Sequence, residues 1–430
     1  MELFKELSGF RMSPVREDMI HVLGSAFNEN LPETKVFEYL RRGVSPEPMG
    51  RLVVIGFGKA SQGMYEGVKR FFGNRISNSA IIAPVEAYRD FEPPLLPGNH
   101  PLPSRESIES SRIVMDLLTG LKEEDLVIVL ISGGGSSLFE VLKDGVDLSS
   151  YNRVIECMMR NGASISEVNA IRYLFSEVKG GGLLRYTYPA NVLGLVISDV
   201  PGDSIWTIAS GPTSNPPDQS FVEKVSMKFG GLCSIPLPQY PIEYPKSRSR
   251  NEIVLRNSDF VSSICRGLVK KGYRVHDVGS GIVGYTSTVA KLFVDKMRED
   301  YNENRSPIFV VGGGESSTEV KGNGTGGRNL ETSMKVLLLM EDEEIFAFGS
   351  IGTDGIDGSS KAMGAIVDNS SLKTLKREYI RESLSRSESL KPLKESRDAL
   401  FTGFTGTNVA DIFIGYYAGI GKGAQITDPS

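Results

Sequence analysis

The sequence predicts an α/β protein with two α/β/α domains. Three apolar runs lead into glycine-rich turns: VVIGFGKAS at Val53–Ser61, VIVLISGGGSS at Val127–Ser137 and IFVVGGGESS at Ile308–Ser317. Apolar runs without alternation are typical of strands that are buried on both faces of a parallel sheet. Helical spacing between such runs, as in Arg105–Leu121, predicts βα units and therefore a Rossmann-like doubly wound parallel sheet in the first domain.

Length and composition indicate a globular protein with more than one domain. Its 430 residues exceed what one hydrophobic core usually holds, and 40% hydrophobic with 23% charged residues is ordinary for a folded protein. The formal net charge of −5 gives no basic field, which argues against a nucleic-acid partner. No apolar run approaches the ~20 residues that span a bilayer, so no membrane partner is expected.

Cysteine content and the N-terminal sequence predict a cytoplasmic protein. Cys157, Cys233 and Cys265 are odd in number and widely spaced, which favours buried thiols in a reducing compartment over a disulfide or a zinc site. The sequence MELFKELSGF at the N-terminus lacks the continuous apolar core of a signal peptide.

Proline-rich stretches mark an expected loop and the expected domain boundary. Five prolines within Phe91–Pro103 predict irregular structure. Four prolines and a basic run within Ile235–Arg250 predict a boundary, with an N-terminal domain at 1–235, a linker at 236–250 and a C-terminal domain at 251–430. Helical spacing before Leu52 predicts helices that pack outside the first sheet.

The first glycine turn places Lys59 at the start of a helix. GFGKAS lacks the third glycine of a dinucleotide-binding fingerprint, because Ser61 occupies that place. A cation at a helix start opposes the helix dipole unless an anion lies nearby. We therefore expect Lys59 to face a ligand rather than to extend into solvent.

The second glycine turn, SGGGSS, is typical of a phosphate-binding loop. Three consecutive glycines cost more backbone entropy than an ordinary turn requires, and successive backbone N–H groups bind anions. A serine nucleophile is poorly supported, because the chain has only three histidines and no G-x-S-x-G string. A further run, KGGGLL from Lys179, fits a helix C-cap as well as it fits a ligand contact.

Three more strings supply candidate carboxylates and an arginine. Asp199 directly follows an apolar run in SDVPGD, and in parallel sheets ligands bind beyond the strand ends. GNGTGGRN delivers Arg328 to the head of a helix, where its guanidinium suits a carboxylate or phosphate; the glycines predict a loop that a ligand orders. In GTDGIDG, Asp354 and Asp357 are the candidate ligands of a Mg²⁺-type cation.

Taken together, these strings resemble the MOFRL-type (type 2) glycerate kinases. GKA, HPLP, LISGGGSS, NAIR, VKGG, SDVPGD and ASGPT occur in the first half of the chain, and GGGE, GNGTGGRN, GTDGIDG and TGTNVAD follow in the second. Many long glycine strings in one order make the resemblance specific. Leu174 stands where histidine is common in the family, and Gly182 stands where a polar residue is usual.

The resemblance implies an ATP- and Mg²⁺-dependent kinase that phosphorylates the 2-hydroxyl of D-glycerate in a cleft between two α/β domains, the second a smaller MOFRL-like domain. It implies catalytic roles for Lys59, Asp199 and Arg328, and substrate binding by Lys59, Arg328 and Ser132. The implied phosphate-binding residues are Gly133, Gly134, Gly135, Ser136, Ser137, Lys179, Gly312, Gly313, Gly314, Glu315 and Asn408. The alternative activity is an NAD(P)-dependent hydroxypyruvate reductase, and a homodimer is compatible with either activity.

Overall fold

The chain folds into two compact units, each with its own sheet. The computed structural model describes residues 2–4, 9–44, 49–85, 93, 95–235 and 246–421. We call the two units by their sheets. The first-sheet unit combines Leu31–Arg256 with Gly406–Asn408, and the second-sheet unit combines the described residues of Met1–Asn30, Asn257–Thr405 and Val409–Ser430.

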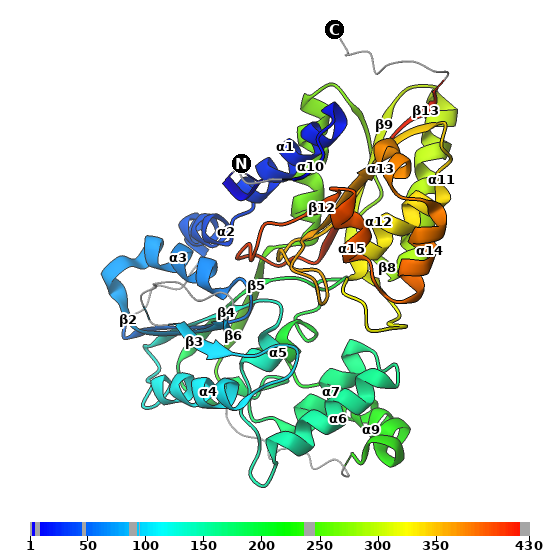
Figure 1. The fold of residues 1–430 in the computed structure, drawn as a ribbon. Coiled ribbons are helices and arrows are strands. Elements are labelled where there is room, and N and C mark those ends of the chain that lie inside the picture. The colour runs from blue at the N-terminus through cyan, green and yellow to red at the C-terminus, as the bar shows by residue number, and fades with distance from the viewer. Residues whose placement is uncertain are drawn as a thin grey trace. The chain divides into compact units, whose positions relative to one another are not determined.

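The first sheet confirms the predicted doubly wound parallel fold. Within the described residues its six strands have the order β3-β2-β1-β4-β5-β6, and all neighbours run parallel, which is the strand order of the Rossmann fold. Figure 1 shows α3 and α4 on opposite sides of this sheet. The strands are β1 (Leu52–Phe57), β2 (Ile76–Pro84), β3 (Leu95–Gly98), β4 (Leu126–Ile131), β5 (Asn191–Ile197) and β6 (Ser249–Leu255).

Strand β3 corrects the expectation of irregular structure throughout Phe91–Pro103. Its residues Leu95–Gly98 pair in parallel with β2. Pro97 is tolerated because β3 is the edge strand of the sheet, where a missing N–H donor leaves no neighbour unpaired.

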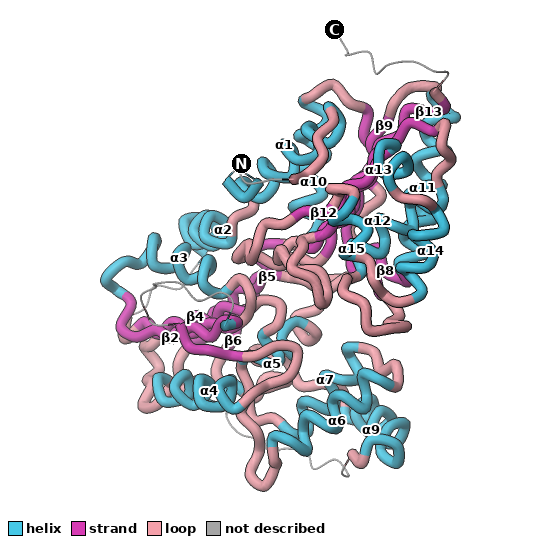
Figure 2. Tube along the Cα trace, in the orientation of Figure 1, coloured by secondary structure: helices cyan, strands magenta, loops and turns pink. Residues whose placement is uncertain are grey.

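The helices of the first-sheet unit cover the sheet and form a separate helical group. Helices α6, α7 and α9 pack on one another around buried residues such as Tyr151, Ile155 and Phe229, and Figure 2 shows them as a group of helices apart from the strands. The helices are α2 (Pro32–Tyr39), α3 (Ser61–Phe72), α4 (Arg105–Leu117), α5 (Gly135–Leu138), α6 (Leu148–Arg160), α7 (Ile165–Phe175), α8 (Leu183–Tyr186) and α9 (Gln219–Cys233).

The second sheet is mixed. Its order is β12-β11-β10-β13-β9-β7, with β8 also paired to β9; β7 and β8 run parallel to β9, and β13 runs antiparallel to β9 and to β10. Helices α11 and α12 pack on it, as do α1 and α10. The strands are β7 (Arg274–Asp277), β8 (Ile282–Tyr285), β9 (Ile308–Ser317), β10 (Glu344–Gly352), β11 (Gly364–Asp368), β12 (Ala399–Leu400) and β13 (Asp411–Ile420). The helices are α1 (Pro14–Glu29), α10 (Asn257–Lys270), α11 (Thr286–Asn304), α12 (Arg328–Leu339), α13 (Asn369–Thr374), α14 (Arg377–Ser385) and α15 (Leu390–Glu395).

Helix α1 belongs to the second-sheet unit, so the prediction that the N-terminal helices pack outside the first sheet is wrong for α1. It is confirmed for α2, which packs on α3 and β6 of the first-sheet unit. Helix α1 lies against α10, and its fully buried Arg16 reaches two carboxylates. Nε of Arg16 lies 2.6 Å from Asp368, and Nη2 lies 2.8 Å from Asp398. The partners are more than 350 positions away along the chain, so local sequence gives no sign of them.

The division between the units also differs from the predicted linker. Residues 251–255 were assigned to the C-terminal domain, but they belong to β6, which pairs in parallel with β5 and extends the first sheet. The division therefore falls between Arg256 and Asn257. Residues 236–245 of the predicted linker lie outside the described residues. No described helix has both the length and the apolarity needed to cross a membrane.

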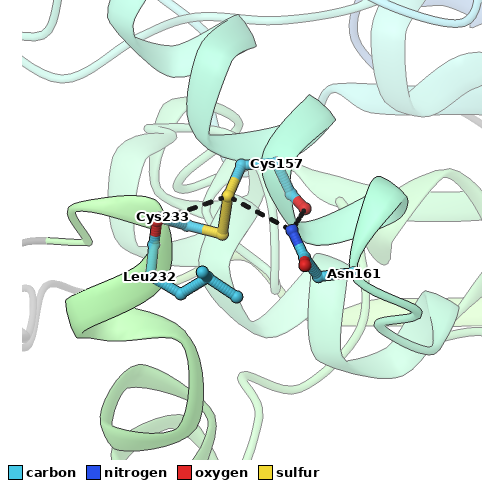
Figure 3. Close-up of a disulfide and its surroundings, with 4 residues drawn as sticks. All are labelled: Cys157, Asn161, Leu232 and Cys233. Atoms are coloured by element: carbon cyan, nitrogen blue, oxygen red, sulfur yellow. Dashed lines mark hydrogen bonds between the residues drawn. A yellow bond between two sulfur atoms is a disulfide. The ribbon is translucent and has the colours of Figure 1, made fainter.

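A disulfide between Cys157 and Cys233 joins α6 to the end of α9 (Figure 3). Sγ of Cys157 lies 3.6 Å from the carbonyl oxygen of Leu232, and Asn161 donates through Nδ2 to the carbonyl of Cys157 at 2.8 Å. The prediction of three thiols is therefore wrong for two of them, because tertiary packing brings together cysteines that are 76 positions apart. Cys265 is a free thiol, and burial together with Asp277 raises its pKa to about 12.

We expect reduction of this disulfide to lower the free energy of unfolding of the first-sheet unit by about 4 kcal/mol, because a bond that closes a long loop restricts the unfolded chain. Urea unfolding with and without reductant measures the effect. The double variant C157S/C233S should match the reduced protein and ignore reductant, whereas C265A should respond like the wild type. An unchanged transition in protein shown by mass to be reduced would contradict the expectation.

Candidate active site

The loops that follow β1 and β4 lock together at the point where the strand order of the first sheet reverses. Lys59 donates its backbone N–H to the carbonyl of Gly133 at 2.9 Å, and Ala60 donates to Oγ of Ser132 at 3.0 Å. Gly58 has φ +126°, and a Cβ there would lie 2.2 Å from Oγ of Ser132, so only glycine fits. Open parallel sheets bind ligands at such a switch point.

The glycine loop after β4 leaves backbone donors available. Its turn is closed by hydrogen bonds from Gly135 to the carbonyl of Ser132 and from Ser137 to the carbonyl of Gly134, each 3.2 Å. In the part of the chain that the structure describes, the N–H groups of Gly133 and Gly134 have no such acceptor. Consecutive unbonded N–H groups form an anion-binding concavity, which supports the predicted role of this loop.

Polar side chains surround the loop. A Cβ at Gly133 would lie 1.9 Å from Oδ2 of Asp199, and one at Gly134 would lie 3.5 Å from Cγ of Lys59 and 3.4 Å from Cδ2 of His100. The structure thus brings predicted residues Lys59 and Asp199 to the same glycine loop. It adds His100 from the HPLP string, which the sequence reasoning did not assign to the site.

Asn408 positions the carboxylate of Asp199. It donates through Nδ2 to Oδ2 of Asp199 at 3.0 Å, and its side chain is almost fully buried. Asn408 comes from the three-residue segment Gly406–Asn408, which belongs to the first-sheet unit although its flanking residues belong to the other. The predicted role of Asn408 near nucleotide phosphates stays a prediction, and the structure places its amide against the carboxylate of Asp199.

The predicted serines and Lys179 divide into exposed and buried groups. Ser136 is partly exposed, whereas Ser132 and Ser137 are buried and bond to the loops themselves. Lys179 is fully buried, and its Nζ donates to the carbonyl of Phe139. Its place beneath the loop favours a supporting role over direct contact with a ligand.

The third glycine run is a strand and not a turn. Gly312, Gly313 and Gly314 lie inside β9 and pair with β13, so the prediction of a phosphate turn at these residues is wrong. Glycine is required here for close packing. A Cβ at Gly313 would lie 1.8 Å from Oδ1 of Asn257, and one at Gly314 would lie 1.9 Å from the carbonyl oxygen of Ile282.

Arg328 begins α12 and is held by two carboxylates. Nε lies 2.7 Å and Nη2 3.0 Å from the two oxygens of Asp411, and Nη1 donates to Glu315 at 2.6 Å. Burial opposes its charge, but Asp411 and Glu315 more than compensate and raise the pKa of Arg328. This fork geometry is the one that guanidinium groups form with carboxylates. Asp411, the last residue of the TGTNVAD string, was missed as a site residue.

Asp357 caps α12 and is a poor metal ligand here. Its buried carboxylate accepts the backbone N–H groups of Asn329 at 3.1 Å and Leu330 at 2.9 Å. Burial raises the pKa of Asp357 to about 7; these two hydrogen bonds oppose the rise, and neighbouring Asp411 adds to it. A Cβ at Gly327 would lie 2.3 Å from Cγ of Asp357, so the last glycine before Arg328 makes room for this cap.

Asp354 remains the only partly exposed member of the predicted metal pair. Its Oδ1 accepts the N–H of Ile356 at 3.2 Å. Among the residues that the structure describes, no three His, Cys, Asp or Glu side chains are grouped to hold a metal ion. A preformed cation site therefore does not follow from this aspartate string.

The glycine loop before Arg328 is packed and not free. Gly324 donates to the carbonyl of Arg386 at 3.0 Å, and a Cβ at Gly322 would lie 2.6 Å from that same oxygen. A Cβ at Gly326 would lie 2.1 Å from Oγ of Ser389. The expectation that a ligand orders this loop is not supported, because its glycines fit against the segment between α14 and α15.

Known proteins resemble this chain over nearly its full length. Models described as a domain of unknown function (DUF4147) and as the MOFRL family match residues 18–227 and 308–411. Glycerate 2-kinase of Picrophilus torridus is 32% identical over 96% of this chain and 99% of its own length. D-glycerate 2-kinase of Thermotoga maritima is 35% identical over 85% and 91%.

A solved structure agrees with these sequence matches. The crystal structure of glycerate kinase from Thermotoga maritima covers 94% of this chain and 99% of its own with a TM-score of 0.82 and 30% sequence identity. The architecture of two α/β units accords with that relationship. The chain therefore belongs to the family of MOFRL-type glycerate kinases.

Proposed function

We propose that this protein is an ATP-dependent glycerate 2-kinase that converts D-glycerate to 2-phosphoglycerate and ADP. The observation that carries the proposal is the carboxylate of Asp199, fixed by Asn408 against Gly133 and beside a loop with available N–H donors. A base next to a phosphate-binding loop is the arrangement that phosphoryl transfer to a hydroxyl requires.

In the proposed reaction the 2-hydroxyl oxygen of glycerate bonds to the γ-phosphorus of ATP as the bond from that phosphorus to the β–γ bridging oxygen breaks. The hydroxyl proton passes to Asp199, and ADP leaves. The loop at Gly133–Ser137 binds phosphate oxygens through its N–H groups. Lys59 offsets charge on the transferred group, and this positioning with charge neutralisation provides most of the catalysis.

Arg328 has a more limited role than the sequence suggested. Asp411 and Glu315 already balance its charge, and three of its five N–H groups face these carboxylates. Its two remaining N–H groups suit an oxygen of glycerate or phosphate. Orientation of that oxygen, more than net positive charge, is the contribution we assign to Arg328.

Magnesium is part of the proposal as the partner of ATP. Mg²⁺ takes one or two carboxylate oxygens together with substrate phosphates. Asp354, which is partly exposed, fits that requirement, whereas Asp357 does not because its carboxylate is buried against α12. When bound, Mg²⁺ would offset negative charge on the phosphates of ATP.

We expect purified protein to form ADP only when ATP, Mg²⁺ and D-glycerate are all present. Coupled detection of ADP measures the rate, and phosphorus NMR of the product distinguishes 2-phosphoglycerate from 3-phosphoglycerate. The same preparation is tested with hydroxypyruvate and NADH or NADPH. Oxidation of the nicotinamide without ADP formation would replace the kinase by the reductase, and 3-phosphoglycerate as product would overturn the assigned position.

A further inference from the structure

A fully buried lysine lies directly beneath the glycine loop of the first-sheet unit. Lys179 sits between α7 and α8, and its Nζ donates to the carbonyl oxygen of Phe139. Phe139 in turn donates its N–H to the carbonyl of Gly135 at 3.1 Å. Two consecutive hydrogen bonds therefore connect the ammonium group of Lys179 to the loop.

Phe139 also links this lysine to the loop that carries Lys59. Its ring stacks on Phe57 with the centroids 4.5 Å apart and the planes 12° from parallel. Phe57 is the last residue of β1, two positions before Lys59. The contact made by Lys179 thus lies where the two loops of the candidate site are joined.

Positive charges outnumber negative charges in the buried group around Lys179. Its charged and titratable neighbours are Glu140 after α5, Tyr151 on α6 and Arg172 on α7. Glu140 is the single carboxylate among them, and it also accepts from the hydroxyl of Tyr151 at 2.8 Å and from Ser176 at 2.5 Å. One buried carboxylate therefore faces two buried cations, Lys179 and Arg172.

Among the described residues, no second carboxylate forms an ion pair with Arg172 to neutralise the excess positive charge. Arg172 is 5% exposed, and its Nε has no hydrogen-bond partner among the described residues. Nη1 donates to the side-chain oxygen of Asn169 at 3.3 Å, and the guanidinium also hydrogen-bonds to Tyr151. Both partners are neutral groups. A net positive charge is thus buried below a loop that has N–H groups available to bind an anion.

We propose that Lys179 is a positioning residue that strengthens anion binding by the glycine loop, through its contact with Phe139 and through its buried positive charge. The identity of the anion, the phosphates of ATP, rests on the proposed function. The role differs from direct phosphate binding, because Lys179 is fully buried behind the loop.

Raising the pH separates this role from a merely structural one. Burial lowers the pKa of Lys179 to about 8, with Glu140 opposing and Arg172 assisting the shift. Because the folded pKa is lower than the unfolded one, loss of the proton above pH 8 adds to folding stability. The same loss removes the charge beneath the loop. Anion affinity should therefore fall over the pH range in which the lysine's contribution to stability rises.

The test compares wild type, K179M and K143M. Lys143 is the control, because burial lowers its pKa too and its Nζ approaches a backbone carbonyl, that of Tyr173, at 3.5 Å. It is partly buried, whereas Lys179 is fully buried. Lys143 makes no contact with the glycine loop in the described structure. Calorimetry measures the affinity for ADP at pH 7.5 and pH 9.5, and thermal unfolding at both pH values measures stability.

We expect K179M to bind ADP about tenfold more weakly than wild type at pH 7.5, the order of effect of one buried charge that acts on an anion from roughly 12 Å away at an effective dielectric constant of about 20. Wild type and K143M should weaken by a similar factor between pH 7.5 and 9.5, and K179M should not share this weakening. Changes in the ionisation of ADP itself apply to all three proteins. The melting temperature of K179M should match or exceed that of wild type.

The remaining outcomes of the ADP-binding test contradict either the role of Lys179 or the proposed kinase activity. Equal ADP affinity in K179M and wild type would overturn the inference, as would the absence of ADP binding in wild type. If K179M does not fold, a wild-type affinity that fails to drop above pH 8 overturns it instead. If binding depends on Lys179 but no glycerate is phosphorylated, the inference stands and the proposed function fails.

Discussion

Replacing Asp199 by asparagine is expected to lower kcat for glycerate phosphorylation by about 10²–10⁴-fold, the usual contribution of a positioned general base. Asparagine is nearly the same shape and keeps a side-chain oxygen for the hydrogen bond from Asn408. The fold and the KM for ATP should therefore change little. Steady-state kinetics with each substrate varied in turn measures the effect.

Asp203 provides the matched control for this substitution. It lies four residues further along the same string, and its carboxylate pairs with the partly exposed Arg256 at 3.1 Å. D203N should keep the wild-type kcat, because loss of a partly exposed ion pair changes the stability of the fold little. If D199N and D203N both retain more than a tenth of the wild-type kcat, Asp199 is not the base.

Replacing Arg16 by methionine is expected to lower the free energy of unfolding of the second-sheet unit by about 3–5 kcal/mol, because it leaves buried carboxylates without their counter-ion. Asp368 and Asp398 both lose their partner, and the hydrogen bond to Oγ of Ser371 is lost as well. Urea unfolding followed by circular dichroism measures the loss.

Arg11 offers a comparison within the same N-terminal segment. Its guanidinium donates to Ser370 and Thr374 but is only half-buried and meets no buried carboxylate in the described structure. R11M should cost well under half as much as R16M. Equal losses would show that the two substitutions simply detach the N-terminal segment and that the buried charges are not responsible.

The first sheet was predictable because its signals are local. Apolar runs without alternation at β1, β4 and β5 are typical of strands buried on both faces, and a glycine or aspartate follows each within two residues. Lys59, Asp199 and the Gly133–Ser137 loop follow from the rule that the ends of parallel strands meet at one edge. The structure confirms that arrangement for the first sheet.

The second sheet was less predictable because its glycines serve distant partners. Gly313 is required by Asn257, and Gly327 is required by the carboxylate of Asp357, which no spacing in the sequence reveals. The sequence of a glycine run does not distinguish a run that binds phosphate from one that packs against a neighbouring side chain. The roles of Asp357 as a helix cap and of Asp411 as the partner of Arg328 were hidden for the same reason.

The disulfide could not be predicted from cysteine spacing, because its partners too are distant in the sequence. Cys157 and Cys233 meet only because α6 and α9 pack together, and two helices separated by that much sequence give no joint pattern. Composition limits the disulfide count but not the pairing. A helix-packing signal shared by α6, α7 and α9 would have been needed to place the two sulfur atoms together.

Helix α1 packs with a sheet whose strands are synthesised much later, and this affects folding during synthesis. Arg16 and Asp368 are 352 positions apart, so at 5–20 residues per second the ribosome needs on the order of 20–70 s to deliver the partner. Strands β1 to β6 emerge and can pair within that interval. Helix α1 cannot pack on its own sheet during that time. Its residues Met19, Val22 and Leu23, which are fully buried in the finished protein, therefore stay uncovered. Until then the apolar face of α1 is open to chaperones or proteases.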